Sequence, residues 1–379
     1  MEPRMITRIP AVMYRGGTSK GPLFLASDLP NDPGGILDRV MLAAMGSPHP
    51  RQIDGIGGAE SLTSKIAIIS KSARSDADID YFFVQVNPDS PIVDYASNCG
   101  NMLSAVGPFA IENGLIAAGD PTTTVRIYNT NTDSVIIAEL QTPNGTTTYE
   151  GDAAIDGVNG TASPVRLNFV KSVGSKTKKL LPTGKVREII QDVEVTLIDV
   201  AVPMMIVSAA AVGKRGNESK PELDADRPLI ARLEKMRNEA GRRMGLGDTS
   251  NLVIPKPVMV SAPTKGGVIA SRDFVPYNCH ATHSVTGAMA LATACILPGT
   301  VASDLAVLPK SQVKKIAIEH PGGVIEVETE SVGSDLAGFE LKQASLIRTC
   351  RKLFEGWICI PSSVWDGKTG LQSPSRAVA

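Results

Sequence analysis

Two short stretches of sequence decide the fold: Cys99-Gly100-Asn101-Met102 in the first half of the chain and Thr286-Gly287-Ala288-Met289 in the second. They superpose at an offset of 187 residues, close to half of the 379-residue chain. Each half also carries a lysine beside an apolar run, Lys65 and Lys256, at an offset of 191 residues. Offsets this similar indicate a divergent internal duplication, with chance similarity of short patterns as the alternative.

The residues around these stretches predict a strand-rich fold with few helices. The chain holds 35 Gly and 26 Pro, more turn-forming residues than a helical bundle needs. Short β-type runs recur between turns. Apolar periodicity predicts helices at 36–45, 101–112, 229–244, 286–295 and 347–354.

This pattern predicts an α+β fold of two pseudo-symmetric lobes, each a strand-rich sheet wrapped around one apolar central helix. The chain length also favours two domains of ~150–200 residues each. We expect one lobe over 1–184 and the other over 185–349, with the tail 350–379 packed back on the first lobe. The Ser/Gly/Lys-rich stretch 171–185 is the predicted linker.

Charge and composition exclude several classes of function. Lys and Arg number 38 against 39 Asp and Glu, a net charge of -1, and aromatic residues make up 4% of the chain. Neither feature suits a nucleic-acid or membrane-surface protein. The longest apolar stretch, 200–212, is interrupted and shorter than the ~20 residues that span a bilayer. Five cysteines without CxxC spacing, and no signal-peptide pattern, predict a cytoplasmic protein.

Two segments of the first half carry residues suited to proton transfer. Asn98-Cys99-Gly100-Asn101 lies where a loop meets an apolar helix, and unpaired N–H groups there can bind a carboxylate or lower the pKa of a thiol. Lys65 starts an apolar strand after a Gly-rich loop, where desolvation can produce a free amine. A buried structural cysteine and a solvated lysine are the alternatives.

Two further segments are candidates for anion binding. Arg15-Gly16-Gly17-Thr18-Ser19-Lys20-Gly21 offers amides, hydroxyls and cations suited to a carboxylate, or forms a simple hairpin turn; it is not a phosphate-binding loop. Cys279-His280-Ala281-Thr282-His283 suggests metal ligands, yet a zinc site made only of protein groups needs four. We therefore favour an anion contact by a histidine, with Arg272 as a further charge partner.

Together these segments, with 45-MGSPHPRQIDGIGG-58 and 279-CHATHSVTGAMALATA-294, resemble the 2-methylaconitate isomerase and 4-oxalomesaconate tautomerase family of PrpF-type proteins. The resemblance runs from Tyr14 to about Phe354, and 152-DAAIDGV-158 is most similar to the oxalomesaconate branch. It implies a diaminopimelate epimerase-like fold with the active site between the lobes, where the two central helices begin.

The resemblance also implies an allylic isomerisation in which Lys65 and Cys99 match the catalytic lysine and cysteine. Epimerases of this fold use two cysteines, one in each lobe, whereas here the position that corresponds to Cys99 is Thr286. A threonine hydroxyl is too weak an acid to serve as the opposing base, which disfavours inversion of a stereocentre. We expect Lys65 to remove a proton and Cys99 to return one or to stabilise the enolate, and the sequence leaves these two roles exchangeable.

The expected reaction is therefore a 1,3-proton shift that moves a C=C bond in an unsaturated tricarboxylate, first of all 4-oxalomesaconate. A dienolate intermediate requires preplaced hydrogen-bond donors, and no metal or organic cofactor is expected. The predicted substrate-binding residues are Arg15, Ser19, Ser64, Asn98, Gly100, Asn101, Met102, Arg272, His280, Thr286, Gly287 and Ala288.

Several alternatives remain at this point. Within the same chemistry they are the isomerisation of cis- and trans-aconitate and that of 2-methylaconitate or methylitaconate, and the loop 283-HSVT-286 departs from the oxalomesaconate branch. Outside it they are a two-base racemase and a non-catalytic carboxylate-binding accessory protein. The expected partner is the small tricarboxylate, with a homodimer as the candidate assembly.

Overall fold

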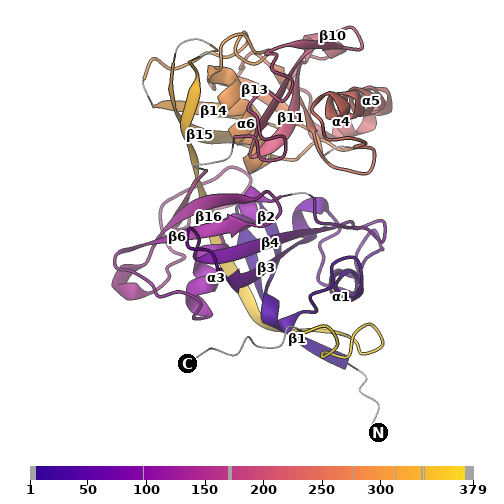
Figure 1. Cartoon of the computed structure of the whole chain (residues 1–379), viewed down its shortest axis with the longest axis vertical. Coiled ribbons are helices and arrows are strands. Elements are labelled where there is room, and N and C mark those ends of the chain that lie inside the picture. The colour runs from indigo at the N-terminus through magenta and orange to yellow at the C-terminus, as the bar shows by residue number, and fades with distance from the viewer. Residues whose placement is uncertain are drawn as a thin grey trace.

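The chain forms two strand-rich lobes stacked along its long axis, each with helix inside (Figure 1). The computed structural model describes residues 6–371 apart from 97, 170–172, 276, 312, 334, 335 and 337. The first-lobe strands are β1 (Ile6–Gly16), β2 (Ser19–Leu25), β3 (Lys65–Lys71), β4 (Ile79–Val86), β5 (Val93–Asp94), β6 (Thr122–Asn129), β7 (Ser134–Gln141) and β8 (Pro164–Asn168).

The second lobe and the helices complete the described fold. The second-lobe strands are β9 (Glu188–Ile190), β10 (Val193–Val200), β11 (Val202–Ser208), β12 (Lys256–Ser261), β13 (Ile269–Asp273), β14 (Lys314–His320) and β15 (Gly323–Val332), and β16 (Glu340–Pro361) serves both lobes. The α-helices are α1 (Ile36–Met45), α2 (Gly100–Leu103), α3 (Val106–Glu112), α4 (Lys220–Ala225), α5 (Arg227–Arg243) and α6 (Val285–Ile296), and short 3₁₀ turns lie at Ala26–Asp28, Ser61–Thr63, Pro143–Gly145 and Ala210–Val212.

Strand pairing repeats between the lobes. From β1 to β2, β3, β4, β6 and β7 the neighbours alternate antiparallel, parallel, antiparallel, parallel, antiparallel. From β10 to β11, β12, β13, β14 and β15 the pattern is the same. Helices α2 and α3 follow β4 as α6 follows β13. The repeat confirms the predicted α+β fold with two pseudo-symmetric lobes, and it places Lys65 and Lys256 at the starts of corresponding strands, β3 and β12.

One long strand, β16, connects the lobes. It pairs with β15 in the second lobe, with β8 near the boundary, and with β1 along residues 350–361, which closes the first-lobe sheet around α2 and α3. The predicted helix over 347–354 is therefore wrong. The apolar residues of this segment are spaced as in a helix, but they do not share one buried face. In the strand, Ile347 and Phe354 are exposed while Leu346 and Cys350 face the core.

The central helices are apolar on most of their surface and lie buried inside the lobes. Eleven of the twelve residues of α6 are buried, so the helix is enclosed by the second-lobe strands on all sides. In the first lobe the predicted helix over 101–112 is divided into α2 and α3 around residues 104 and 105. Pro108 explains the break, because it has no N–H to donate to the carbonyl of Ser104 one turn earlier.

Two amphipathic helices cover the outer faces of the sheets. Helix α1 packs against the first-lobe strands with Val40, Met41 and Met45, and α5 covers the second-lobe strands with Leu233 and Met236. Among the described helices none is both long and apolar enough to span a bilayer.

A close backbone approach between β2 and β3 sets the start of β3. A Cβ added to Gly21 would lie 1.8 Å from the carbonyl oxygen of Lys65. Gly21→Ala must therefore displace backbone, and we expect it to lower the free energy of unfolding by about 2–4 kcal/mol. Chemical denaturation measures the change.

Gly356→Ala is the matched control, since a Cβ at Gly356 in β16 meets nothing within 4 Å. Alanine there should leave stability unchanged or raise it by about 0.5 kcal/mol, because glycine in a strand costs more conformational entropy. Equal stability of the two variants would contradict the close approach at Gly21.

Candidate active site

The two lobes meet where their central helices begin. A Cβ added to Gly100, the first residue of α2, would lie 2.5 Å from Val285 Cγ1 and 3.6 Å from the backbone nitrogen of Thr286 in α6. Only a glycine permits this approach. The first N–H groups of a helix have no partner within the helix and attract negative charge. The amides of both helices therefore begin within a few ångströms of one another.

Cys99 precedes α2 directly and is buried. Its thiol donates to Ser19 Oγ at 3.8 Å. Its carbonyl accepts a hydrogen bond of 3.0 Å from the buried Tyr81 hydroxyl, which holds the backbone in place. Cys99 and Ser19, both predicted from the sequence, are thus brought together.

Lys65 is buried at the start of β3 and donates to Gln85 Oε1 at 2.6 Å. Its ammonium lies 5.2 Å from the centre of the Phe83 ring. The Gln85 amide nitrogen donates to the carbonyls of Ser61 and Ser64, so its oxygen is directed at Lys65. Burial lowers the pKa of Lys65; Cys99 opposes the shift, and the ammonium of Lys256 adds to it.

In the second lobe, Asp273 fixes the start of α6. Its Oδ2 accepts hydrogen bonds from the backbone nitrogen and the hydroxyl of Ser284 at 3.0 and 2.5 Å. His283 lies between Ser271 Oγ at 3.1 Å and the carbonyl of Ser284 at 3.0 Å. Since a carbonyl only accepts, His283 Nδ1 carries the proton.

His280 lies in the same region as a neutral imidazole. Burial lowers the pKa of His280 to about 3, and the ammonium groups of Lys256 and Lys65 contribute to this lowering. Its Nδ1 accepts the Thr282 N–H at 3.1 Å, which leaves the proton on Nε2. His280 can therefore donate to an anion without carrying charge itself.

Four buried polar atoms around the helix starts have no hydrogen-bond partner among the described residues. They are Asn98 Oδ1, Asn101 Oδ1, Asp273 Oδ1 and Thr286 Oγ1. Because a buried polar atom without a partner is costly, their gathering here fits a site that is completed by a ligand. Thr286 is the second residue of α6, whereas Cys99 directly precedes α2, so their correspondence stays a prediction from the sequence.

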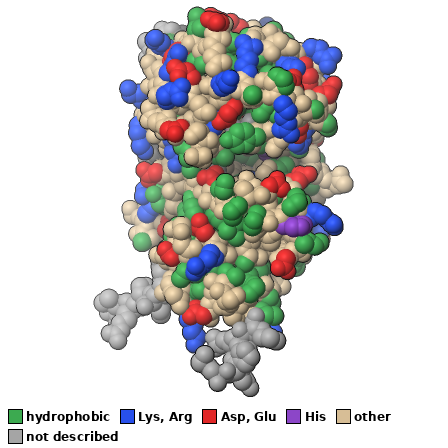
Figure 2. Space-filling model, turned by 90° about the vertical axis from the view of Figure 1, so that its right-hand side faces the viewer, with side chains coloured by type: hydrophobic (Ala, Val, Ile, Leu, Met, Phe, Trp, Pro, Cys, Tyr) green, Lys and Arg blue, Asp and Glu red, His purple; other side chains and the backbone are tan. Residues whose placement is uncertain are grey.

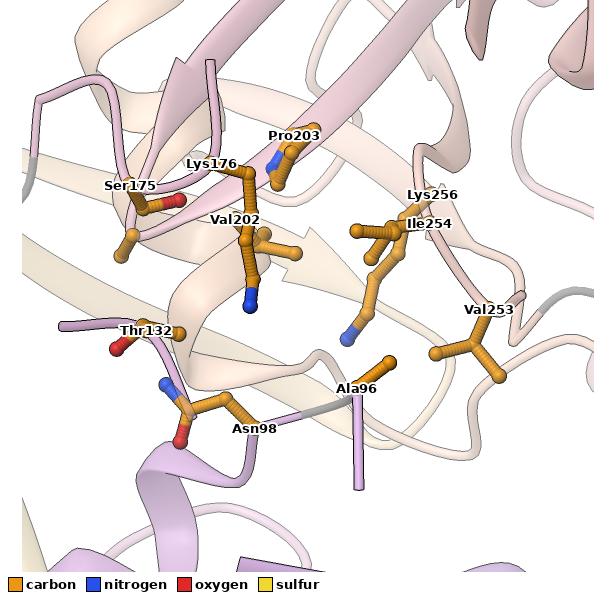
Figure 3. Close-up of a pocket in the computed structure, with 11 residues that line it drawn as sticks. Ala96, Asn98, Thr132, Ser175, Lys176, Val202, Pro203, Val253, Ile254 and Lys256 are labelled. Atoms are coloured by element: carbon orange, nitrogen blue, oxygen red, sulfur yellow. The ribbon is translucent and has the colours of Figure 1, made fainter. Parts of the chain in front are cut away.

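A small cavity opens beside Asn98 at the boundary of the lobes (Figure 3). Ala96, Asn98 and Thr132 line it from the first lobe, and the others come from the linker and the second lobe. Those lining residues are Ser175, Lys176, Ala201, Val202, Pro203, Val253, Ile254 and Lys256. The ammonium of Lys176 donates to the carbonyl of Asn131 and so joins the two sides.

Three predicted binding residues are already engaged by the protein. Arg15 donates to the carbonyls of Gly17 and Thr349, and the Ser64 hydroxyl donates to Gln52 Oε1 at 2.7 Å. The Ala288 N–H bonds the carbonyl of Ser284, because it is the fourth amide of α6 and completes the first helical turn.

Arg272 is directed away from α6. It donates to the carbonyl of Glu218 at 2.6 Å, whereas its strand neighbours Ser271 and Asp273 contact His283 and Ser284. Successive residues of a strand point to opposite faces, so Arg272 lies on the other face of β13 from Ser271 and Asp273. A role of Arg272 in substrate binding stays a prediction.

The remaining predicted residues lie around the helix starts: Ser19, Asn98, Gly100, Asn101, Met102, His280, Thr286 and Gly287. Their roles stay predictions. Of the suggested metal ligands, Cys279 packs in the apolar core under α5, whereas the His283 side chain is hydrogen-bonded to Ser271. The two side chains therefore lie in different surroundings.

Sequence reasoning missed Gln85 and Asp273 and gave Lys256 no role. Gln85 faces Lys65 only through the register of β3 and β4, which no local pattern shows.

On the face in Figure 2, acidic and basic side chains are interspersed over both lobes. This face shows no concentration of positive charge, so the cations considered for the site are the buried lysines Lys65 and Lys256. A buried amine, a thiol and neutral donors together can move protons on a bound anion.

Comparison with known proteins agrees with this arrangement. The model of the PrpF protein family matches residues 6–361. The 4-oxalomesaconate tautomerase of Pseudomonas putida is 47% identical over 361 residues, which are 95% of this chain and 98% of that protein. The crystal structure of a methylitaconate-delta-isomerase has a TM-score of 0.76 at 34% identity, and the match covers 97% of this chain and 99% of that one.

A more distant match concerns the fold alone. A hydroxyproline epimerase from Agrobacterium vitis has a TM-score of 0.56 at 13% identity, over 96% of this chain and 93% of that one. The predicted epimerase-like fold is confirmed by this similarity and by the duplicated strand order.

The environment of Lys65 predicts how its ionisation responds to Gln85. Gln85→Glu places a carboxylate where Oε1 now accepts, which stabilises the charged amine and raises the pKa of Lys65. A larger share of Lys65 should then be protonated at neutral pH. NMR titration of labelled lysine side chains, with Lys65→Met to assign the signal, measures the shift.

Gln141→Glu adds the same charge at the exposed end of β7 and should leave the Lys65 titration unchanged. A Lys65 signal that titrates at the same pH in wild type and Gln85→Glu would show that the hydrogen bond is not formed in solution.

Proposed function

Because the chain belongs to the PrpF protein family, we propose that it is an isomerase that moves a C=C bond within an unsaturated tricarboxylate, with 4-oxalomesaconate as its substrate. The observation that carries the proposal is a buried amine, Lys65, whose pKa is influenced by Cys99 in the same lobe, with Cys99 at the start of α2 and Thr286 in the first turn of α6. The 4-oxalomesaconate tautomerase with 47% identity supports the choice of substrate.

The reaction that we propose is a 1,3-proton shift. The Lys65 amine takes a proton from the carbon next to the unsaturated acid, and the electron pair of that C–H bond enters a dienolate. A proton then bonds to the carbon two positions away, so that one C–H bond is broken, another is formed and the double bond moves. Since burial lowers the pKa of Lys65, more of the amine is in its basic form than in a solvated lysine.

The surroundings suit the charge that develops in this step. The dienolate concentrates negative charge on oxygen, and the free amides at the start of α6 and the neutral His280 can donate to it. Removal of one such donor typically costs ~10²–10³ in rate. We assign the return of the proton to Cys99, whose thiol is held by Ser19.

Thr286 argues against a two-base racemase. Inversion requires acid–base groups on both faces of one carbon, and the hydroxyl of Thr286 is too weakly acidic to be deprotonated near neutral pH. An allylic shift does not need that second group.

A second candidate substrate is methylitaconate. It is favoured by the likeness to the methylitaconate-delta-isomerase structure along nearly the whole chain. The two substrates differ in their carboxylates and carbonyl groups, so direct assay of both separates them. We also propose a cytoplasmic location, which suits an odd set of five free cysteines. A homodimer stays a prediction.

The proposal predicts which acids react and which residues are needed. Incubation with 4-oxalomesaconate in D₂O should change the ultraviolet absorbance and introduce deuterium at the allylic carbon, as NMR detects. Lys65→Met should lower kcat by at least about 10³-fold, because no other base is assigned, and Cys99→Ala by about 10²-fold.

Thr286→Val tests the two-base racemase separately, because turnover that persists in this variant would rule out Thr286 as the opposing base. An accessory binding protein would bind these acids without turnover and keep its function in Lys65→Met. Absence of turnover with each of the unsaturated acids would overturn the isomerase proposal.

A further inference from the structure

Lys256 occupies the place in the second lobe that Lys65 occupies in the first. Each lysine is the first residue of a strand that runs parallel to the preceding neighbour and antiparallel to the following one. Both are buried, with 9% of Lys65 and 5% of Lys256 exposed. The duplication has therefore kept an amine at both positions, while the cysteine before α2 is matched by Thr286 in the sequence.

The ammonium of Lys256 reaches into the cavity between the lobes. In Figure 3 its side chain extends from β12 toward the first-lobe segment that carries Ala96 and Asn98. Asn98 is the residue before Cys99, and its Oδ1 is one of the buried atoms without a partner among the described residues. The cavity is thus lined by the residue that directly precedes Cys99.

Within the described part of the chain, Lys256 makes no hydrogen bond and no ion pair, unlike the other lysines of this region. Lys65 donates to Gln85, and Lys176, which lines the same cavity, donates to the carbonyl of Asn131. An ammonium that is buried without a partner is costly, unless an anion completes its surroundings.

We propose that Lys256 is a positioning residue that binds one carboxylate of the substrate from the second lobe, while Lys65 faces the labile carbon from the first. The inference rests on the proposed function for its substrate class. In this role Lys256 lets the protein distinguish acids by their number of carboxylates. When the reacting part of the acid is held at the helix starts, a tricarboxylate has one further carboxylate that can bind the Lys256 ammonium. A dicarboxylate has none.

Binding of two related acids tests the inference. trans-Aconitate carries three carboxylates and mesaconate carries two. By isothermal titration calorimetry, Lys256→Met should weaken trans-aconitate about 10- to 100-fold, the loss of one charge-assisted hydrogen bond, and should change mesaconate less than threefold. Retained mesaconate binding also shows that the variant is folded. Lys256→Arg, which keeps the charge, should recover most of the affinity.

Lys265→Met is the matched control, because it removes an exposed lysine from the same lobe and should leave both affinities unchanged. In turnover assays Lys256→Met should raise KM for the tricarboxylate more than it lowers kcat. Equal weakening of both acids, or none, in Lys256→Met would overturn the inference. Wild-type protein that binds trans-aconitate through Lys256 but isomerises no acid would overturn the proposed function alone.

Discussion

The contact between Gly100 and the first turn of α6 is the constraint on which the rest of the structure depends. It brings together the starts of two central helices that belong to different lobes, and it admits no side chain at residue 100. Each lobe supplies one helix from the same topological position, so the contact follows from the duplication rather than from a local motif. Strand β16 maintains it, because that strand is shared by both sheets and limits how far the lobes can separate.

This arrangement produces an unusual balance of buried charge. Lys65, Lys256 and Arg348 are all buried near the boundary of the lobes, and burial lowers the pKa of Arg348 to about 9. Taking a cation out of water costs several kcal/mol, which acidic partners usually offset. Two buried acids at this boundary, Asp199 and Asp273, hold backbone and hydroxyl groups instead of these cations. Asp199 accepts from Ser175 and from the backbone nitrogen of Lys176, and Asp273 Oδ2 accepts both hydrogen bonds from Ser284. The excess of cations suits a substrate that brings its own negative charges.

The sequence predicted the parts of this structure that depend on short-range patterns. Helix α1 has the predicted bounds, and α6 differs from its prediction by one residue at each end, since its apolar residues cover every face. Residues whose role depends on pairing between strands could not be found in this way. Gln85 reaches Lys65 through register, Arg272 lies one strand position away from the residues that face α6, and 347–354 form a strand because β1 and β8 flank them.

The duplication also explains why the site can be asymmetric without loss of its framework. The framework requires apolar strands, a glycine at the helix contact and a buried central helix in each lobe, and none of these depends on the chemical groups at the helix starts. The position of Cys99 could therefore become threonine in the second lobe, which removes an acid–base group, while the position of Lys65 kept an amine. In the second lobe, which lacks the thiol, the amine of Lys256 has no acid–base partner with which to exchange protons on a substrate carbon. Its ammonium can still bind a negative charge. Retention of Lys256 is thus explained by electrostatic binding of the substrate. The first lobe kept both an amine and a thiol and can transfer protons, whereas the second lobe kept only the amine and binds charge.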